Sequence, residues 1–354
     1  MANLDLDDEK AVTRLDSGGV LRQLREFPEQ CVRGWHAGVG VSFPERYRRP
    51  GAVVVAAIGG SAMGPDLVRA AVSGLCRAPI IVNRRSTLPA FVSSETLVVC
   101  SSYSGGTEET LAAFDDAQRR GARIVLMGGG GKLFEIGAAL PQCRIHAKGM
   151  PRAAMGESAL AFAGLLHRLD LAPGLDSQVE GLEAVLRETA RSLDVGVPEA
   201  RNPAKLLARA VAGRIPVIVG AGHLGPVARR WKGQFNENAD QWAVWDELPE
   251  FDHNTIQGLR LPAQAGSGLH VIFLHAASEG PESPSPSHHS ARLLEAAGVP
   301  VSLVRVRGEG PLAQALAAVV WGDFVSLYIA ALNGVDPTPI ENIVELKRLK
   351  SGRS

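Results

Sequence analysis

Residues 52–65 of this chain read AVVVAAIGGSAMGP. The first seven are apolar, which is typical of a strand buried on both faces of a sheet. The glycines that follow interrupt the strand, and a proline such as Pro65 often stands at the start of a helix. This stretch therefore predicts a buried strand over 52–58, a tight turn, and a helix from Pro65 to Ala71.

The same order of strand, polar turn and helix recurs along the chain. A second glycine turn at 222–226 also follows an apolar run and also ends in Gly-Pro, which indicates a weak internal repeat. Alternation of this kind predicts two related α/β domains, each a mainly parallel, flavodoxin-like sheet flanked by helices. The other strands are expected at 79–83, 97–101, 123–127, 216–220, 270–274 and 301–306, and two further helices at 108–120 and 340–350.

The length of the chain also favours two domains, because 354 residues exceed the usual size of one. We expect a helical segment over 1–50, a first domain over 51–195, and a second domain over 196–354 that ends in a helix. The apolar run 312–332 contains polar residues and is predicted to be a buried helix rather than a membrane span. The Ser-, Pro- and Gly-rich stretch 277–290 is expected to be an exposed loop that leaves its two histidines in solvent.

Charge and composition exclude several classes of protein. Lys+Arg and Asp+Glu both number 37, so no basic surplus points to nucleic acid or to an anionic membrane. The acidic N-terminus does not look like a signal peptide. The four cysteines form no CxxC pair and are interpreted as buried thiols in a reducing compartment, so a cytoplasmic location is expected.

Two polar turns follow strands in the first half of the chain, GGSAMG at 59–64 and SSYSGGT at 101–107. Ligands of a parallel sheet bind beyond the carboxyl ends of its strands, where glycines expose backbone N–H groups and a helix N-terminus attracts anions. The turns therefore predict a phosphate cradle without a lysine, and ordinary capped loops are the alternative. Neither turn matches the Walker A or the dinucleotide-binding pattern. The candidate phosphate ligands are Gly60, Ser61, Ser102, Ser104 and Thr107.

Six motifs make a specific resemblance visible. Residues 102–110 look like the SYSGNTxET signature of sugar isomerase (SIS) domains, which bind phosphosugars. The others are GGSAMG at 59–64, PRAA at 151–154, FNENA at 235–239, LPE followed by HN at 248–254, and LKR at 346–348. In this order they resemble the bifunctional phosphoglucose/phosphomannose isomerases. The resemblance implies two SIS domains and an enzyme that interconverts glucose 6-phosphate and mannose 6-phosphate with fructose 6-phosphate.

Aldose–ketose isomerisation moves a proton between C1 and C2 of the opened sugar through a cis-enediol, and it needs no metal or other cofactor. It requires a base, an acid–base group at the ring oxygen and a cation near the enediolate oxygen. In the family's pattern the base falls on Glu237, ring opening on His253, and the enediolate contact on Arg152. Lys347 would reach the substrate hydroxyls or the C1 oxygen. The resemblance also implies an obligatory homodimer in which His253 reaches the neighbouring subunit's site.

Each of these four residues has a plainer interpretation when it is taken alone. Glu237 lies in a polar Asn-Glu-Asn turn after an apparent helix and could be a surface glutamate. His253 lies in a polar loop and could be structural, with Asp252 as a helix cap or orienting partner. Arg152 could form a surface ion pair, and Lys347 could be a solvated lysine.

Several positions depart from the family pattern. Gly106 stands where asparagine is usual, Asp240 where lysine is usual, and Asp252 where histidine is frequent. Trp242 and Trp245 add aromatic bulk near the FNENA segment. These changes leave the fold prediction intact but leave substrate identity and activity open.

Other classes of function remain to be weighed. A non-catalytic phosphosugar sensor would keep the SIS pocket, although it would not need all four catalytic candidates. An aminotransferring SIS enzyme would carry an N-terminal cysteine nucleophile domain, and Cys31 has no such context. Metal-dependent isomerisation is disfavoured because the sequence shows no clustered His and Glu ligands.

Overall fold

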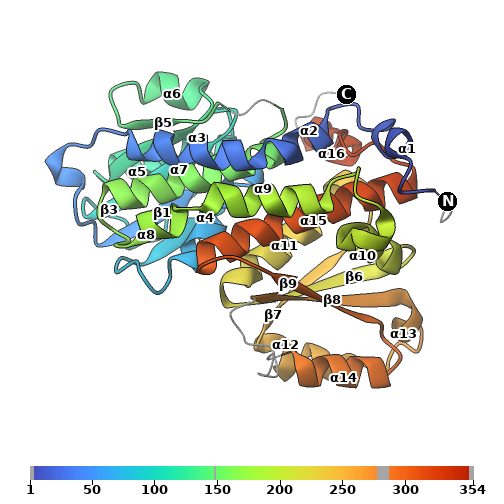
Figure 1. The fold of residues 1–354 in the computed structure, drawn as a ribbon. Coiled ribbons are helices and arrows are strands. Elements are labelled where there is room, and N and C mark those ends of the chain that lie inside the picture. The colour runs from blue at the N-terminus through green and yellow to red at the C-terminus, as the bar shows by residue number, and fades with distance from the viewer. Residues whose placement is uncertain (1–3, 147–148, 277–286, 351–354) are drawn as a thin grey trace. The chain divides into compact units, whose positions relative to one another are not determined.

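The computed structural model describes residues 4–146, 149–276 and 287–350, which form two compact α/β units (Figure 1). The N-terminal sheet unit comprises residues 26–187 and 308–316. The C-terminal sheet unit comprises the described parts of 1–25, 188–307 and 317–354. Each unit has its own parallel sheet and its own core, as the alternation of strands and helices predicts.

The N-terminal sheet unit has five parallel strands in the order β2-β1-β3-β4-β5. This is the flavodoxin-like order, in which the winding direction reverses between β1 and β3. Every residue of β1 is buried, as expected for a strand covered on both faces. The strands are β1 (Ala52–Ala56), β2 (Ile80–Asn83), β3 (Thr96–Ser102), β4 (Arg123–Gly128) and β5 (Gln142–Arg144).

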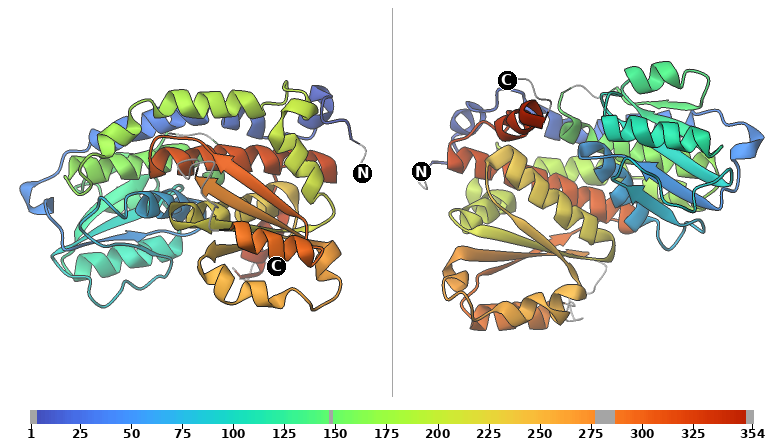
Figure 2. Two further views of the ribbon diagram at one scale, coloured as in Figure 1. Left: turned by 60° about the horizontal axis from the view of Figure 1, so that its bottom comes forward. Right: turned by 180° about the vertical axis from the view of Figure 1, so that it is seen from behind.

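Helices cover both faces of this sheet. Alternate strand residues such as Val54 and Val98 pack with Phe114 in a core beneath α5 (Glu108–Arg119) and α6 (Lys132–Ile136). On the other face, α4 packs on β1 and β3 and against α7, which in turn packs against α3. The remaining elements of the unit are α3 (Phe27–Val39), η1 (Glu45–Tyr47), α4 (Gly60–Ala71), η2 (Pro151–Ala154), α7 (Met155–Arg168) and α8 (Leu175–Val179). Figure 2 shows these layers from two further directions.

Helix α4 begins at Gly60 rather than at Pro65, so the expected start was wrong by five residues. Gly59 has a φ of 58°, which turns the chain directly from strand into helix. Pro65 therefore lies inside the helix, where it cannot donate to the carbonyl of Ser61. The hydroxyl of Ser101 donates to that carbonyl instead, at 3.3 Å.

The C-terminal sheet unit has four parallel strands in the order β7-β6-β8-β9. The strands are β6 (Ile215–Ala221), β7 (Val244–Leu248), β8 (Leu269–Ala276) and β9 (Val301–Val306). Two strands, β5 and β7, were not predicted from the sequence. Both lie at the edge of their sheet, and edge strands are shorter or less buried than the central apolar runs that reveal a strand.

The helices of this unit again lie on both faces of its sheet (Figure 1). Phe251 of α12 (Glu250–His253) and Leu294 of α14 (His288–Ala296) pack on β6 and β8. On the other face α11 (Gly225–Ala239) packs on β6 and β7. Its fully buried Trp231 donates to Ala318 O at 2.8 Å. The remaining elements of this unit are α1 (Glu9–Thr13), α2 (Val20–Arg25), η3 (Glu199–Arg201), α10 (Pro203–Val211), η4 (Gly222–Leu224), η5 (Thr255–Gly258), α13 (Ala265–Gly268) and α16 (Glu341–Lys350). Helices α9 (Leu182–Leu193) and α15 (Pro311–Asn333) have residues in both units.

The internal repeat seen in the sequence has a structural counterpart. Gly222 has a φ of 53°, close to the 58° of Gly59, and each glycine follows the first strand of its sheet and precedes a helix. A residue with a Cβ rarely adopts such angles, which explains why glycine occupies both positions. The two units therefore begin with the same strand–turn–helix geometry.

The long apolar segment forms α15, a helix long and apolar enough to span a membrane by length and composition. Its apolar window is 94% buried inside the structure, as predicted for a core helix. Residues 277–286 of the expected exposed loop lie outside the described residues. His288 and His289 are exposed as expected, but they begin α14 rather than belonging to a loop.

The four cysteines are free thiols. Cys31, Cys100 and Cys143 are buried as predicted, whereas Cys76 is only partly buried. Burial raises the pKa of Cys100 to about 12, and burial together with the carboxylate of Glu157 raises the pKa of Cys143 to about 12. Both therefore stay protonated near neutral pH and act as small apolar side chains.

Candidate active site

The two hydroxyl-rich turns lie side by side at the carboxyl end of the N-terminal sheet. The turn at 59–64 follows β1 and the turn at 103–107 follows β3, and these two strands are paired neighbours. The order of the sheet reverses between them, which is where doubly wound sheets bind their ligands. Helices α4 and α5 begin at these turns, so two positive dipole ends point toward the same region.

Hydrogen bonds hold the two turns together. The backbone N–H of Tyr103 donates to Ser61 Oγ at 3.0 Å, across 42 positions of the sequence. Ser101 donates to the carbonyl of Ser61 from the same strand end. Ser61 is therefore fixed by both its side chain and its backbone, and it joins the first turn to the second.

The hydroxyl groups of the second turn are not equivalent. Ser102 is 1% exposed, and its Oγ accepts from Gly105 N at 3.1 Å and lies 2.9 Å from Thr107 Oγ1. Ser104 is exposed, and its Oγ accepts only one long hydrogen bond among the described residues, from Gly106 N at 3.3 Å. Ser102 therefore braces the turn from inside, whereas Ser104 presents its hydroxyl to solvent and to any ligand.

Arg152 lies beside the first turn. It belongs to η2 and is only 6% exposed, so it is not the surface ion-pair residue of the plainer interpretation. A Cβ added at Gly60 would lie 3.2 Å from Arg152 N and 3.1 Å from Pro151 C, which shows how closely the PRAA backbone approaches the start of α4. The structure thus brings Arg152 and the predicted phosphate turns together within one unit.

A buried carboxylate was missed by the sequence reasoning. Glu157 of α7 is fully buried, and its Oε1 accepts from His146 N at 2.6 Å. Within the described residues its Oε2 accepts no hydrogen bond, and Arg33 Nε lies 4.0 Å away. Burial and this carboxylate together raise the pKa of the Tyr103 hydroxyl. The available signal was a single charged residue within the otherwise uncharged helical run 155–166, because a charged residue is seldom buried without a role.

Glu237 lies in the last turn of α11 rather than in a polar turn after it, so that expectation was wrong. The asparagines on either side secure this turn. Asn238 is buried and donates to Ser326 Oγ at 2.9 Å, and Asn236 donates to Gln241 O at 2.8 Å. The half-buried Glu237 is held between these two anchors.

A cavity of about 370 Å³ opens beside Glu237. Three further carboxylates line it, and the segment that leads into α16 forms its other wall. The lining residues are Asn236, Glu237, Asp240, Val335, Asp336, Pro339, Ile340, Glu341, Asn342 and Ile343. Glu237 therefore lines a space large enough for a small molecule.

The structure does not place His253 at this cavity. His253 ends the short helix α12 and is exposed. Asp252 accepts from Ser290 at 2.5 Å, and the N-cap of α12 is Pro249, so Asp252 is neither the helix cap nor the orienting partner expected from the sequence. His253 is therefore not among the residues that line the cavity beside Glu237.

Lys347 also lies away from the Glu237 cavity. It belongs to α16, whose described side chains are exposed, and the neighbouring Arg348 forms an ion pair with Glu345 at 2.8 Å. The start of α16, at Glu341, does line the cavity. Lys347 is thus on the helix that leaves the cavity and not among the residues that line it.

One departure from the family pattern, Asp240, has a local explanation, whereas nothing in the structure explains the glycine at position 106. Asp240 caps α11 with a φ of 47°, and aspartate tolerates this left-handed conformation better than most residues. Gly106 is exposed at the tip of the second turn and donates its N–H to Ser104. Trp242 is 75% exposed, and Trp245 lies beneath the guanidinium of Arg229 at 5.6 Å, which the sequence did not indicate.

Within residues 4–146, 149–276 and 287–350, no group of three or more His, Cys, Asp or Glu side chains could hold a metal ion. The polar groups of the two turns are hydroxyls and backbone amides, which suit an anion.

Two parallel α/β units, one with hydroxyl-lined turns at its switch point, define a phosphosugar protein of the SIS class. Residues 200–349 match the family model of the bacterial phospho-glucose isomerase C-terminal SIS domain. The bifunctional phosphoglucose/phosphomannose isomerase of Caldicellulosiruptor bescii is 35% identical over 91% of this chain and 96% of its own length. The enzyme of the same name from Aquifex aeolicus is 31% identical over 76% of this chain and 80% of its own length. This chain therefore belongs to the family of bifunctional phosphoglucose/phosphomannose isomerases, as its six motifs predict.

Solved structures agree with this fold. A glucose-6-phosphate isomerase like protein from Thermus thermophilus superposes with a TM-score of 0.65, covering 96% of this chain and 99% of that chain. Its sequence is 20% identical, so the likeness supports the SIS architecture and not a particular substrate.

Proposed function

We infer that this chain is an aldose–ketose isomerase that interconverts glucose 6-phosphate and mannose 6-phosphate with fructose 6-phosphate. The observation that carries the inference is the 35% identity to a bifunctional phosphoglucose/phosphomannose isomerase over 91% of the chain. The two joined turns at the switch point of the N-terminal sheet support it, because they form an anion site of the kind that a sugar phosphate requires. Isomerisation through a cis-enediol uses side chains alone.

The phosphate is assigned to the turns at 59–64 and 103–107. Ser104 is exposed, and Ser61 and Thr107 are half-buried, so a ligand can reach their hydroxyls, whereas Ser102 is buried. Ser61 and Ser102 hold the two turns in place. The backbone N–H groups at the starts of α4 and α5 add donors and a favourable dipole.

Proton transfer between C1 and C2 is assigned to Glu237. A carboxylate in a cavity can accept the C2 proton and return it to C1, and the anchored end of α11 keeps it oriented. Glucose and mannose phosphates are epimers at C2. One base serves both sugars if the C1–C2 unit of the enediol turns to present either face while the phosphate stays bound.

Arg152 is assigned to the developing charge on the enediolate oxygen. Its guanidinium is permanently charged, its side chain is buried, and its backbone lies against Gly60. A buried cation beside an oxyanion acts in a low dielectric, where its stabilisation is strongest. Lys347 is assigned to the substrate hydroxyls on the family pattern alone.

We propose further that the protein is a homodimer in which His253 serves the neighbouring subunit's site. Two observations support this assignment. His253 is exposed at the end of α12, and it does not line the cavity that holds Glu237. An imidazole ring can donate a proton from one nitrogen and accept one at the other, which suits ring opening.

Glu237→Gln tests the function directly, because it keeps the shape and removes the basic oxygen. The expected result is a loss of isomerisation of about 10²–10⁴-fold in both the glucose and the mannose series, the usual cost of removing a general base. Glucose and mannose phosphates formed from fructose 6-phosphate are measured separately. Glu341→Gln is the matched control, because it neutralises another glutamate of the same cavity and is expected to keep activity.

Binding of fructose 6-phosphate, measured by calorimetry, should survive in Glu237→Gln. Loss of the mannose series alone would mean that two bases exist. Full activity of Glu237→Gln in both series would contradict the assignment of the base. Absence of isomerisation in the unmodified protein, together with tight phosphosugar binding, would establish the sensor alternative instead.

A further inference from the structure

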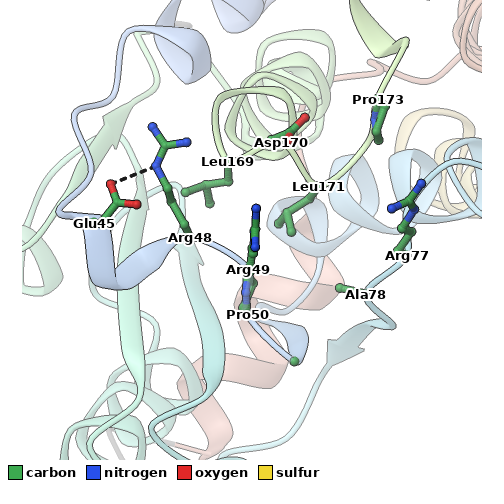
Figure 3. A pocket seen from close by; sticks show the side chains of 11 residues that line it. Glu45, Arg48, Arg49, Pro50, Arg77, Ala78, Leu169, Asp170, Leu171 and Pro173 are labelled. Carbon is green, nitrogen blue, oxygen red and sulfur yellow. Dashed lines mark ion pairs between the residues drawn. The ribbon is translucent and has the colours of Figure 1, made fainter.

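A second polar cavity lies in the N-terminal sheet unit, at the opposite end of the strands from the phosphate turns (Figure 3). Its volume is about 980 Å³. Pro50 and Gly51, which line it, come directly before β1, and Arg77 and Ala78 come just before β2. The cavity is therefore at the amino ends of these parallel strands, whereas the turns at 59–64 and 103–107 follow the carboxyl ends of β1 and β3. It is separate from the predicted sugar-phosphate site.

Three arginines surround this cavity. Figure 3 shows Arg48 and Arg49 next to each other on one side and Arg77 on the other, with Leu171 between Arg49 and Arg77. Within the described parts of the chain, the guanidinium groups of Arg49 and Arg77 have neither an ion-pair nor a hydrogen-bond partner. These two cations are available to a ligand without the loss of an internal contact.

The third arginine has a weak internal partner. Arg48 Nε lies 3.1 Å from Glu45 Oε2, and both side chains are mostly exposed to solvent. Exposed pairs of this kind contribute little to stability, so a stronger anion can draw Arg48 away from Glu45. Asp170 is the other acid of the lining, which leaves three cationic against two anionic side chains. The acids can accept hydrogen bonds from hydroxyl or amino groups of the same ligand.

The backbone that carries Arg48 and Arg49 is firmly held. The preceding residue, Tyr47, is 1% exposed and donates its hydroxyl to Ile124 O at 3.0 Å. Arg123 Nη1 donates to the carbonyl of Arg48 at 3.1 Å. Arg49 itself has a φ of 51°, a left-handed conformation that is unfavourable for a residue with a long side chain. Strained residues of this type are concentrated at ligand sites, where the surrounding structure keeps them in place.

We propose that this arginine cavity binds a metabolite with a compact polyanionic group, a diphosphate or a polycarboxylate, at a site distinct from the catalytic one. Guanidinium groups bind phosphate and carboxylate oxygens through paired hydrogen bonds, and three of them around one space match a ligand with several charges better than a single phosphate. Leu169, Leu171 and Pro173 supply an apolar floor for the rest of the molecule.

Calorimetric titration of the full chain with inorganic pyrophosphate and, separately, with citrate tests the proposal. Fructose 6-phosphate is present at saturation, so that the sugar-phosphate site is filled. The expected result is one site per chain for at least one of the two probes, and the comparison tells phosphate from carboxylate recognition. Orthophosphate should bind at least about tenfold more weakly than pyrophosphate or citrate, because it can engage fewer guanidinium groups.

The double variant Arg49→Gly/Arg77→Ala should weaken this binding at least about tenfold, the loss expected for one charge-assisted hydrogen bond. Glycine is chosen at position 49 because it suits the positive φ. The matched control is Arg46→Ala/Arg119→Ala, which removes two exposed arginines of the same unit that do not line the cavity. The control should bind as the unmodified chain does.

Three results would overturn the proposal. One is the absence of binding of both probes at millimolar concentration. Another is probe binding that is seen only when fructose 6-phosphate is left out, which would place the probe at the phosphate turns. The third is an equal loss in the control variant, which would reveal a general charge effect.

Discussion

The unequal surroundings of Ser102 and Ser104 lead to opposite expectations for their alanine variants. Ser102→Ala removes the hydroxyl that accepts from Gly105 N and lies 2.9 Å from Thr107 Oγ1. Ser104→Ala removes an exposed hydroxyl whose only hydrogen bond among the described residues is a long one from Gly106 N. The first change should therefore loosen the turn, and the second should remove a ligand contact without loosening it.

The magnitudes follow from these contacts. Gly105 N keeps a second, longer bond to the carbonyl of Ser102 at 3.3 Å, and Thr107 is half-buried and can turn to water, so neither group is fully orphaned. Two net hydrogen bonds are lost in Ser102→Ala, at a cost of about 1–2 kcal/mol. For a domain of this size that lowers the melting temperature by about 2–8 °C. Ser104→Ala should change the free energy of unfolding by less than about 0.5 kcal/mol.

Kinetics complete the comparison. Loss of a charge-assisted hydrogen bond to phosphate in Ser104→Ala should raise KM about 10–100-fold. Its kcat should be nearly unchanged, because phosphate binding is uniform between ground and transition states. Thermal unfolding and steady-state rates with fructose 6-phosphate measure both effects. An unchanged KM in Ser104→Ala, or an unchanged melting temperature in Ser102→Ala, would refute the assignment of ligand and brace.

Three further predictions concern cofactor, subunits and pH. Chelator should leave activity intact, and a loss that zinc restores would contradict an enediol mechanism run by side chains alone. Mixing His253→Ala and Glu237→Gln subunits should restore about a quarter of wild-type activity if His253 acts in the partner's site. About half of random dimers are mixed, and one of the two sites in each mixed dimer is intact. No recovery of activity would place both residues in one subunit's site. Burial of Asp194 opposes its ionisation, but the two hydrogen bonds from Arg25, at 2.6 and 2.7 Å, keep its carboxyl pKa below the ordinary value. This pair stabilises the fold above the ordinary carboxyl pKa and stops doing so as pH falls through the lowered one, so Asp194→Asn should cost about 0.5–1 kcal/mol near neutral pH. Denaturant melts should show that difference vanishing in acid, and a constant difference at all pH values would contradict it.

Much of the fold could be predicted from local patterns. The central strands were recognised because they are continuous apolar runs, and β9 was placed over Val301–Val306 as observed. The edge strands β5 and β7 escaped, because three residues are too few for a pattern and because β7 is only partly covered. The start of α4 was placed too late, since a proline usually marks a helix start and the sequence does not show that Ser101 supplies the missing donor.

Parts of the candidate site could be predicted in the same way. The glycine turns and their hydroxyls were identified because each turn is a short run of neighbouring residues. Six motifs of this kind indicated the family. The sequence did not separate the roles of Ser102 and Ser104, and it gave no indication that Arg49 and Arg77 line one cavity. The sequence also predicted that Glu237 follows a helix. In the structure α11 continues to Ala239 and ends at Asp240, whose backbone has a left-handed conformation.

The sequence of neighbouring residues was thus enough to indicate two parallel α/β domains, phosphate-binding turns and a sugar-phosphate isomerase family. Each of these patterns lies within a short stretch of the chain. Burial and hydrogen-bond partners depended on the tertiary structure. Ser61 and Tyr103, 42 positions apart, meet only because β1 and β3 pair in the sheet. Glu157 becomes a buried carboxylate only because α7 packs against α4 and α3. Contacts between distant segments determine which polar groups lose water, and that loss decides which of them brace a turn and which remain free to bind a ligand.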